Sequence, residues 1–223
     1  MCSSDATPEP GEAQGFFSDE FPGPGPIHPQ MPGRCCVSGI MEAMTLHIMT
    51  VCTGNICRSP MAEVVLRERL DAAGLGDRVV VDSTGISSEE QGNPMDRRAR
   101  QVLLAAGYSD PALTEHRARR VRPADLGARD LVLPMTAVHA AELRRLARLR
   151  DLPDAAANII MFRTFDPAAP RTQDSSQERL LDVEDPWYGD ISDFEVCLSQ
   201  VEAAADGIVE WARVRLGDVL EGA

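Results

Sequence analysis

Residues 52–59 read Cys-Thr-Gly-Asn-Ile-Cys-Arg-Ser and contain the side chains that a nucleophilic, anion-binding site would need. Cys52 is a potential nucleophile, and the planar guanidinium of Arg58 can donate hydrogen bonds to two phosphoryl oxygens at once. The Ser59 hydroxyl can donate to the Cys52 sulfur, and Gly54 allows backbone conformations that other residues avoid. These residue types together predict attack of a thiolate on a bound phosphate group.

The elements on either side of this segment would position it. The apolar run at residues 46–51 predicts a strand, and Pro60 suits the first turn of a helix that continues to about Ala73, before Gly74. Backbone N–H groups in a loop between a strand and a helix can converge on one point, and the helix dipole favours negative charge there. The context therefore predicts an anion cradle that stabilises a thiolate at Cys52.

The pattern that follows alternates between strands and helices. Further strands are predicted at residues 79–81, 130–133 and 158–162, and further helices at residues 96–106, 138–149 and 191–216. This alternation is typical of an α/β fold, in which helices cover both faces of a parallel sheet. Ligands of such sheets bind beyond the carboxyl ends of the strands, and Cys52 directly follows the first predicted strand.

Residues 51–63, which read V-C-T-G-N-I-C-R-S-P-M-A-E, are similar to the signature loop of the low-molecular-weight protein tyrosine phosphatases and their bacterial relatives. The resemblance covers about residues 45–216. It implies a flavodoxin-like three-layer sandwich with four parallel strands, and hydrolysis of phosphotyrosine through a phosphocysteine without a metal or another cofactor. It also implies that Cys52 is the nucleophile, that Arg58 is the phosphate clamp, and that the rest of the phosphate-binding loop is Thr53, Gly54, Asn55, Ile56, Cys57 and Ser59.

A tyrosine oxygen leaves phosphorus more easily when a carboxylic acid protonates it, so such an enzyme needs an acid near the loop. Residue type alone leaves several candidates open, namely Asp182, Glu184, Asp185, Asp190 and Asp193. The resemblance selects Asp185, because Asp-Pro-Trp-Tyr at residues 185–188 looks like the family's Asp-Pro-aromatic-aromatic segment. It also implies that Trp187, where the family more often has Tyr, and Tyr188 line the substrate cleft.

Other matched positions are expected to shape or brace the site. Ser83 is placed to hydrogen-bond the loop, and His116 resembles a family histidine that braces the loop asparagine, here Asn55. The alternative for His116 is a surface histidine in a connecting segment. Asp96 is expected to cap or brace nearby structure. Glu89 falls where many members have a Trp that lines the substrate cleft.

The chain has six cysteines, at positions 2, 35, 36, 52, 57 and 197. Their spacing matches no common zinc motif, and three of them lie in a segment rich in Pro and Gly, which disfavours a disulfide framework. Cys57 has two readings. In some family members the equivalent cysteine forms a reversible disulfide with the nucleophile, whereas the alternative is a small packed residue.

The acidic composition limits the possible partners. A net charge of −13 disfavours nucleic acid, which requires a basic surface. No apolar run approaches the roughly 20 residues that span a bilayer, and the N-terminus lacks the features of a secretion signal. We therefore expect a cytoplasmic protein that has no membrane partner. The resemblance implies that its partners are phosphotyrosine proteins, and we expect it to be a monomer. Residues 1–44 are predicted to be a disordered extension, residues 45–216 the phosphatase domain, and residues 217–223 a tail.

Competing activities can be compared on the residues. Protein arginine phosphatases tend to have Thr where Ile56 stands, and the apolar Ile56 side chain favours an aryl ring. Thioredoxin-coupled arsenate reductases use relay cysteines, and none lies between positions 57 and 197. A catalytically inactive phosphopeptide-binding module would lack the nucleophile, the clamp or the acid, and all three are present. A broad small-molecule acid phosphatase stays open, because recognition of phosphate does not fix the leaving group.

Overall fold

The computed structural model describes residues 44–218. The extension expected at residues 1–44 lies, apart from Met44, outside the described residues, as do residues 219–223 of the expected tail. The strands are β1 (Leu46–Cys52), β2 (Val79–Gly85) and β3 (Leu131–Pro134). The α-helices are α1 (Arg58–Ala72), α2 (Arg97–Ala105), α3 (Ala112–Glu115), α4 (Pro123–Gly127), α5 (Ala137–Leu149), α6 (Pro153–Ala157) and α7 (Ile191–Arg215), and the 3₁₀ helices are η1 (Phe162–Phe165), η2 (Ser175–Leu181) and η3 (Pro186–Tyr188).

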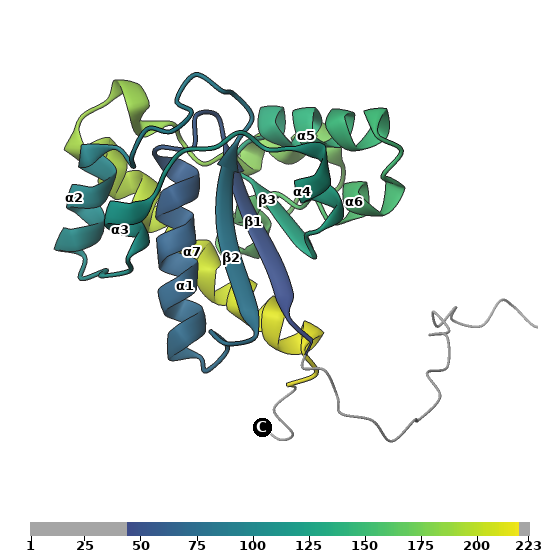
Figure 1. Cartoon of the computed structure of the whole chain (residues 1–223), viewed down its shortest axis with the longest axis horizontal. Helices are drawn as coiled ribbons and strands as arrows, with labels where there is room; N and C mark the ends of the chain where they lie inside the picture. The colour runs from purple at the N-terminus through teal and green to yellow at the C-terminus, as the bar shows by residue number, and fades with distance from the viewer. Residues whose placement is uncertain (1–43, 219–223) are drawn as a thin grey trace, which may run out of the picture. The chain divides into compact units, whose positions relative to one another are not determined.

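The strands form a parallel sheet in the order β2-β1-β3. Cys52 at the end of β1 pairs with Gly85 at the end of β2, while Val51 pairs with Pro134 at the end of β3. The three carboxyl ends are therefore level, and they form one edge of the sheet toward the top of Figure 1. This edge is where a ligand of a parallel sheet is expected.

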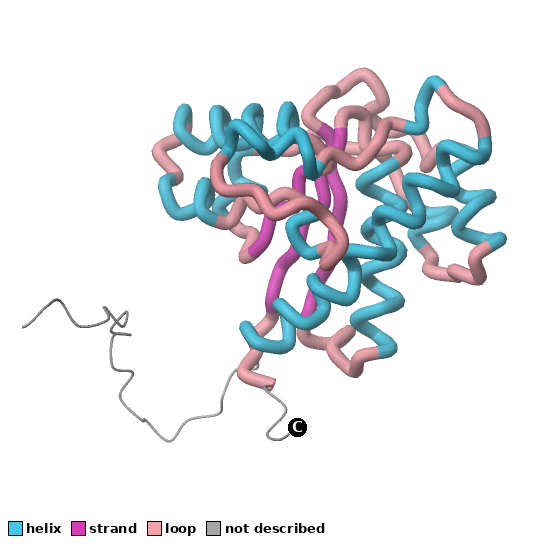
Figure 2. Tube along the Cα trace, turned by 180° about the vertical axis from the view of Figure 1, so that it is seen from behind, coloured by secondary structure: helices cyan, strands magenta, loops and turns pink. Residues whose placement is uncertain are grey.

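Helices cover both faces of the sheet. Alternate side chains of a strand point to opposite faces, so Ile48 packs on the side of α1, α2 and α7, whereas Met49 and Val51 pack on the side of α4, α5 and α6. Figure 2 shows the strands between these two groups of helices. Burial on both faces explains why β1 is an almost continuous apolar run. The predicted α/β fold, with a parallel sheet between helices, is confirmed.

The expected number of four strands is wrong, because the described sheet has three. In the segment predicted as the fourth strand, only Ile159 forms a bridge, with Val132 of β3. Val132 donates to Asn158 O at 2.9 Å and accepts from Ile160 N at 3.0 Å. The next position on β3 that could extend this ladder is Pro134, which has no N–H, and the partner segment turns into η1 at once.

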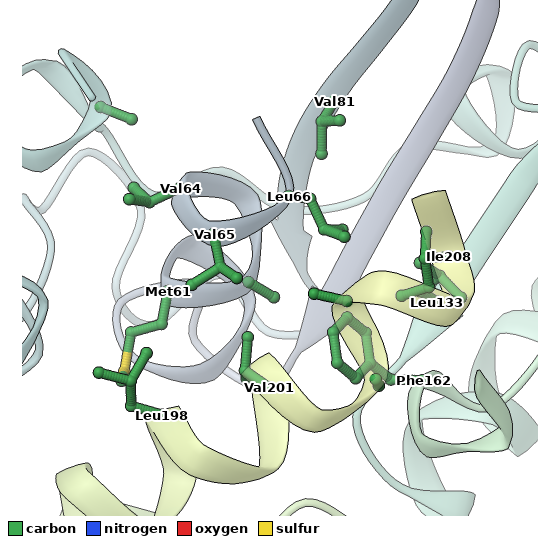
Figure 3. Packing of buried hydrophobic residues seen from close by; sticks show 14 of the residues in the cluster. Met61, Val64, Val65, Leu66, Val81, Leu133, Phe162, Leu198, Val201 and Ile208 are labelled. Carbon is green, nitrogen blue, oxygen red and sulfur yellow. The ribbon is translucent and has the colours of Figure 1, made fainter. Parts of the chain in front are cut away.

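Helix α1 is held in place by α7. Figure 3 shows side chains of α1, including Met61 and Val65, facing side chains of α7, including Leu198 and Val201. All four side chains are buried. Burying an aliphatic side chain contributes about 1.5–3 kcal/mol, so this contact fixes α1 firmly against the sheet. The loop that precedes α1 therefore starts and ends on rigid elements.

Candidate active site

Residues 53–57 form the loop between β1 and α1, at the carboxyl edge of the sheet. Its central residue, Asn55, is fully buried and has a left-handed backbone with φ of 60°. Asparagine tolerates this conformation better than most residues. The Asn55 amide group donates to Ser59 Oγ at 3.0 Å and to Ser83 Oγ at 2.9 Å, and its oxygen accepts from Arg119 N at 2.9 Å. These contacts hold the loop in one shape.

The Cys52 sulfur faces hydrogen-bond donors of this loop. It accepts from Asn55 N at 3.2 Å and from Ser59 Oγ at 3.0 Å, and Cys52 is 3% exposed. The Ser59 hydroxyl also lies 3.2 Å from Thr84 O. Donors directed at a sulfur stabilise negative charge on it, which is the form that attacks an electrophile.

Arg58 begins α1 and is almost completely buried beside the loop. Its Nη2 donates to Asp185 Oδ2 at 2.6 Å and to Thr53 Oγ1 at 3.3 Å, while its Nη1 donates to Val183 O at 3.3 Å. Its Nε has no hydrogen-bond partner within residues 44–218. A buried guanidinium N–H without a partner is costly, and an anion bound in the loop would accept from it.

The two residues expected to brace the loop both contact Asn55. His116 Nε2 lies 2.7 Å from Asn55 O, and since a carbonyl oxygen only accepts, this nitrogen carries the proton. Burial lowers the pKa of His116, which favours the neutral ring. On the other side, Ser83 Oγ donates to Glu63, whose pKa is raised by burial. The loop therefore rests on a buried polar network.

The loop forms the floor of a cleft of about 160 Å³. Most of the residues expected at the phosphate and at the substrate come together here, and the lining is Cys52, Thr53, Gly54, Ile56, Cys57, Arg58, Glu89, Glu90, Asp185, Trp187 and Tyr188. Asn55 and Ser59, also expected in the phosphate-binding loop, are buried beneath the cleft and do not line it. Glu90 is an addition to the expected set. It lies so close to Gly54 that a Cβ at that position would be 2.9 Å from Glu90 Cγ. Tyr188 is 93% exposed and stands at the mouth, while Trp187 is partly covered.

The turn at residues 88–91 carries the two glutamates of the cleft. It is fastened on both sides, because Ser87 N donates to Thr53 O at 3.0 Å and Gly92 N donates to Ala118 O at 2.8 Å. Its own closing bond runs from residue 91 N to residue 88 O at 3.2 Å. The turn is thus attached directly to the floor of the cleft.

Arg98, in the first turn of α2, connects the loop with the Asp185 segment and was not identified from the sequence. Its guanidinium donates to Gly189 O at 2.8 Å and to Trp187 O at 3.1 Å, and it forms an ion pair with Asp96 at 3.1 Å. Asp96 caps α2 by accepting from Arg98 N, and its own N–H donates to Ile56 O at 2.8 Å. A signal for Arg98 would have been its place two residues after a predicted cap.

His139 is a second residue that sequence analysis missed. It lies in the first turn of α5, after the N-cap Thr136, and its Nε2 is 3.0 Å from Thr53 Oγ1. Burial, reinforced by the positive charge of Arg58, lowers the pKa of His139 to about 3. Nothing in its local sequence distinguishes it from an ordinary helix residue.

Cys57 and Cys197 differ from Cys52 in their surroundings. All three are free thiols in the described structure, so it contains no bond between Cys52 and Cys57. Burial raises the pKa of Cys57 and raises that of Cys197 to about 12. Both are therefore neutral, packed thiols at pH 7.

Among residues 44–218, no three or more His, Cys, Asp or Glu side chains are arranged to hold a metal ion. In the same part, no helix has the length and apolar character needed to cross a bilayer.

Comparison with known proteins gives consistent similarities. The family model described as low molecular weight phosphotyrosine protein phosphatase matches residues 47–215. Low molecular weight protein-tyrosine phosphatase A of Mycobacterium tuberculosis is 43% identical over 171 residues, which cover 77% of this chain and 94% of that protein. A protein tyrosine phosphatase from Entamoeba histolytica superposes with a TM-score of 0.64 at 26% identity, over 78% of this chain and 100% of the other. A Drosophila arginine phosphatase shares the fold, with a TM-score of 0.62 at 24% identity over 74% and 97% of the two chains.

Proposed function

Since this chain belongs to the low-molecular-weight phosphotyrosine protein phosphatase family, we propose that it hydrolyses phosphotyrosine in proteins through a phosphocysteine on Cys52. The observation that carries the proposal is the convergence of three groups in one cleft. The Cys52 sulfur, the Arg58 guanidinium and the Asp185 carboxylate all line it. A nucleophile, an anion clamp and an acid are what phosphoryl transfer to sulfur requires.

In the first step, the Cys52 thiolate attacks phosphorus and the bond from phosphorus to the tyrosine oxygen breaks. Asp185, entering this step as the carboxylic acid, donates its proton to the departing oxygen. Arg58 holds two phosphoryl oxygens and spreads the charge of the transition state, and the loop N–H groups assist. The products of this step are phosphocysteine and the free tyrosine side chain.

In the second step, water attacks the phosphorus of phosphocysteine and the bond from sulfur to phosphorus breaks. The Asp185 carboxylate takes a proton from this water, which restores the acid for the next cycle. Cys52 leaves as a thiolate, and the Ser59 hydroxyl at 3.0 Å stabilises it. The phosphate product then dissociates from Arg58.

The proposed preference for tyrosine rests on the side chains that line the cleft. Ile56, Trp187 and Tyr188 present apolar surface to a ring whose phosphate rests on the loop. Glu89 and Glu90 add a negative rim, and we assign them to selection among target proteins. Ser83 and His116 keep their proposed bracing role through Asn55. The need for a reduced Cys52 fits action in the cytoplasm, which cell fractionation would test. We also propose that the protein is a monomer, which light scattering would test.

The test is hydrolysis of matched phosphotyrosine, phosphoarginine and phosphoserine peptides in the presence of EDTA. We expect turnover of the phosphotyrosine peptide only, complete loss in Cys52→Ser, and a loss of about 10²- to 10⁴-fold in Asp185→Asn. Glu184→Gln is the matched control, because Glu184 is the neighbouring carboxylate and does not line the cleft. Faster turnover of phosphoarginine, or activity that survives Cys52→Ser, would overturn the proposal.

A further inference from the structure

A second hollow adjoins the catalytic cleft on the side of α5. It has a volume of about 630 Å³ and is lined by Thr53, Ile86, Ser87, Val138, Ala141, Glu142, Arg145 and Arg148. Thr53 lines both the hollow and the catalytic cleft. The segment after β2 also borders both, with residues 86–87 on the hollow and residues 89–90 on the cleft. A polypeptide that leaves the mouth of the cleft can therefore continue directly into this groove, which we call the α5 groove.

The α5 groove has an apolar part next to the cleft. Val138 is 61% exposed on the first turn of α5, and Ile86 lies partly exposed beside it. Val138 does not close the core, since most of its side chain is in solvent, whereas Ile86 packs on the core with one side and is exposed on the other. An apolar residue of a bound chain would remove both from water.

The far part of the α5 groove carries positive charge. Arg145 is engaged by Glu142, with two contacts of 2.8 Å. Arg148 lies one turn further along the same helix face, and no carboxylate within residues 44–218 forms an ion pair with it. The hydrogen bond from Arg145 lowers the pKa of Glu142, so this carboxylate is charged, and the groove lining sets two arginines, Arg145 and Arg148, against it. The positive charges exceed the single negative one.

The charge here is opposite to that of the protein as a whole. The chain has a net charge of −13, and the cleft wall itself contains Glu89 and Glu90. Because this side of the cleft mouth is basic, a substrate polypeptide with acidic residues would favour this direction when it leaves the cleft. Complementary charge at the rim of a binding site mainly selects partners and speeds their association.

We propose that the α5 groove binds the polypeptide of the phosphoprotein substrate next to the phosphotyrosine, with an acidic residue at Arg148 and an apolar residue against Val138. This inference rests on the proposed function, because it places the phosphate of the same substrate on Arg58. It names the substrate class more closely: phosphotyrosine sites with acidic residues on one side. The Thr53 edge, shared by both hollows, is where the chain crosses from the cleft into the groove.

The experiment compares three phosphotyrosine peptides that differ only in flanking sequence. One is neutral, one has acidic residues before the phosphotyrosine, and one has them after it. Each is measured with wild type, Arg148→Glu, Val138→Ser and the control Arg150→Glu. Arg150 is exposed just beyond the same helix and does not line the groove, so it changes the net charge equally. Each kcat/KM is divided by that of the same variant for p-nitrophenyl phosphate, which occupies only the cleft.

Wild type should prefer one acidic peptide over the neutral one by about 3- to 10-fold, and added salt should reduce this preference. Arg148→Glu should abolish or reverse the preference, Val138→Ser should lower turnover of all three peptides, and Arg150→Glu should retain the wild-type order. Equal values for the three peptides in wild type, or a preference that persists in Arg148→Glu, would overturn the α5 groove proposal. Absence of turnover for every phosphotyrosine peptide would instead reject the proposed function.

Discussion

The Arg58 guanidinium donates to the Asp185 carboxylate at 2.6 Å, although the two residues are 127 positions apart in the sequence. Arg58 is buried, whereas 43% of the Asp185 side chain is exposed. The same guanidinium has an Nε without a partner in the described structure. One side chain thus joins the proposed phosphate position to the proposed acid.

A first prediction concerns this shared guanidinium. Arg58→Lys keeps the positive charge but loses the planar fork, so we expect kcat to fall by about 10²- to 10³-fold and inorganic phosphate to inhibit more weakly. Steady-state kinetics with phosphate as the inhibitor would measure both. Arg150→Lys, at an exposed site, is the control and should leave both values unchanged. Wild-type kcat in Arg58→Lys would exclude a role for the fork.

A second prediction concerns the shape of the loop. Asn55→Ala removes the side chain that contacts Ser59, Ser83 and Arg119 N, leaving buried polar groups without partners. We expect a loss of about 2–4 kcal/mol in the free energy of unfolding and a large fall in kcat. Urea unfolding would measure the first. Asn93→Ala, whose side chain makes one exposed contact, should change stability by less than about 1 kcal/mol.

A third prediction is that Arg98 holds the acid, Asp185, in position. Arg98→Ala removes the hydrogen bonds to Trp187 O and Gly189 O, so the Asp185 segment should move away from the leaving group. An acid matters most when the leaving oxygen is basic. We therefore expect kcat/KM to fall about tenfold for phenyl phosphate and much less for a dinitrophenyl phosphate.

The controls for this prediction are a substitution of the neighbouring residue and a double variant. Arg97→Ala changes an exposed arginine that lines a different hollow, and it should leave both substrates unaffected. In an Asp185→Asn background, Arg98→Ala should have little further effect, because the acid is already lost. An equal loss for both substrates would show that Arg98 acts on the fold and not on the acid.

A fourth prediction concerns the pH dependence of stability. Burial and Arg58 hold the pKa of His139 near 3 in the folded protein, below its ordinary 6.5. Between these values the unfolded chain binds a proton at position 139 and the folded protein does not. This contribution to stability is therefore complete above about pH 6.5 and is lost as the pH falls toward 3, by about 1.4 kcal/mol per pH unit. His139→Gln should flatten the profile between pH 8 and pH 5 in urea unfolding, and a parallel profile would contradict the assignment.

The parts of the fold that the sequence predicted best were those with strong local patterns. The first strand, the loop that follows it and the helix α7 depend on residues close in the sequence. The prediction of a fourth strand was wrong because an apolar run does not show which hydrogen-bonding groups the neighbouring strand provides. Its ladder depends on Pro134, which lies on another strand and lacks an N–H.

The site likewise has a part that local sequence predicts and a part that depends on contacts between distant residues. Its loop is a contiguous segment, so residue type and spacing were enough to propose Cys52 and Arg58. Arg98 and His139 act through contacts that cross 89 and 86 positions of sequence, with Trp187 O and Thr53 respectively. Both residues sit in ordinary helical surroundings, and only the packed structure brings them to the cleft.

The fastening of the turn at residues 88–91 has a consequence for how this scaffold can change. Because Ser87 and Gly92 are each held by backbone hydrogen bonds, the two ends of the turn are fixed by bonds in which the side chains of Glu89 and Glu90 take no part. Substitutions at Glu89 and Glu90 can therefore change the charge at the rim of the cleft while the residues that bind phosphate stay the same. Chimaeras that transplant only this turn would separate its share in target preference from that of the α5 groove.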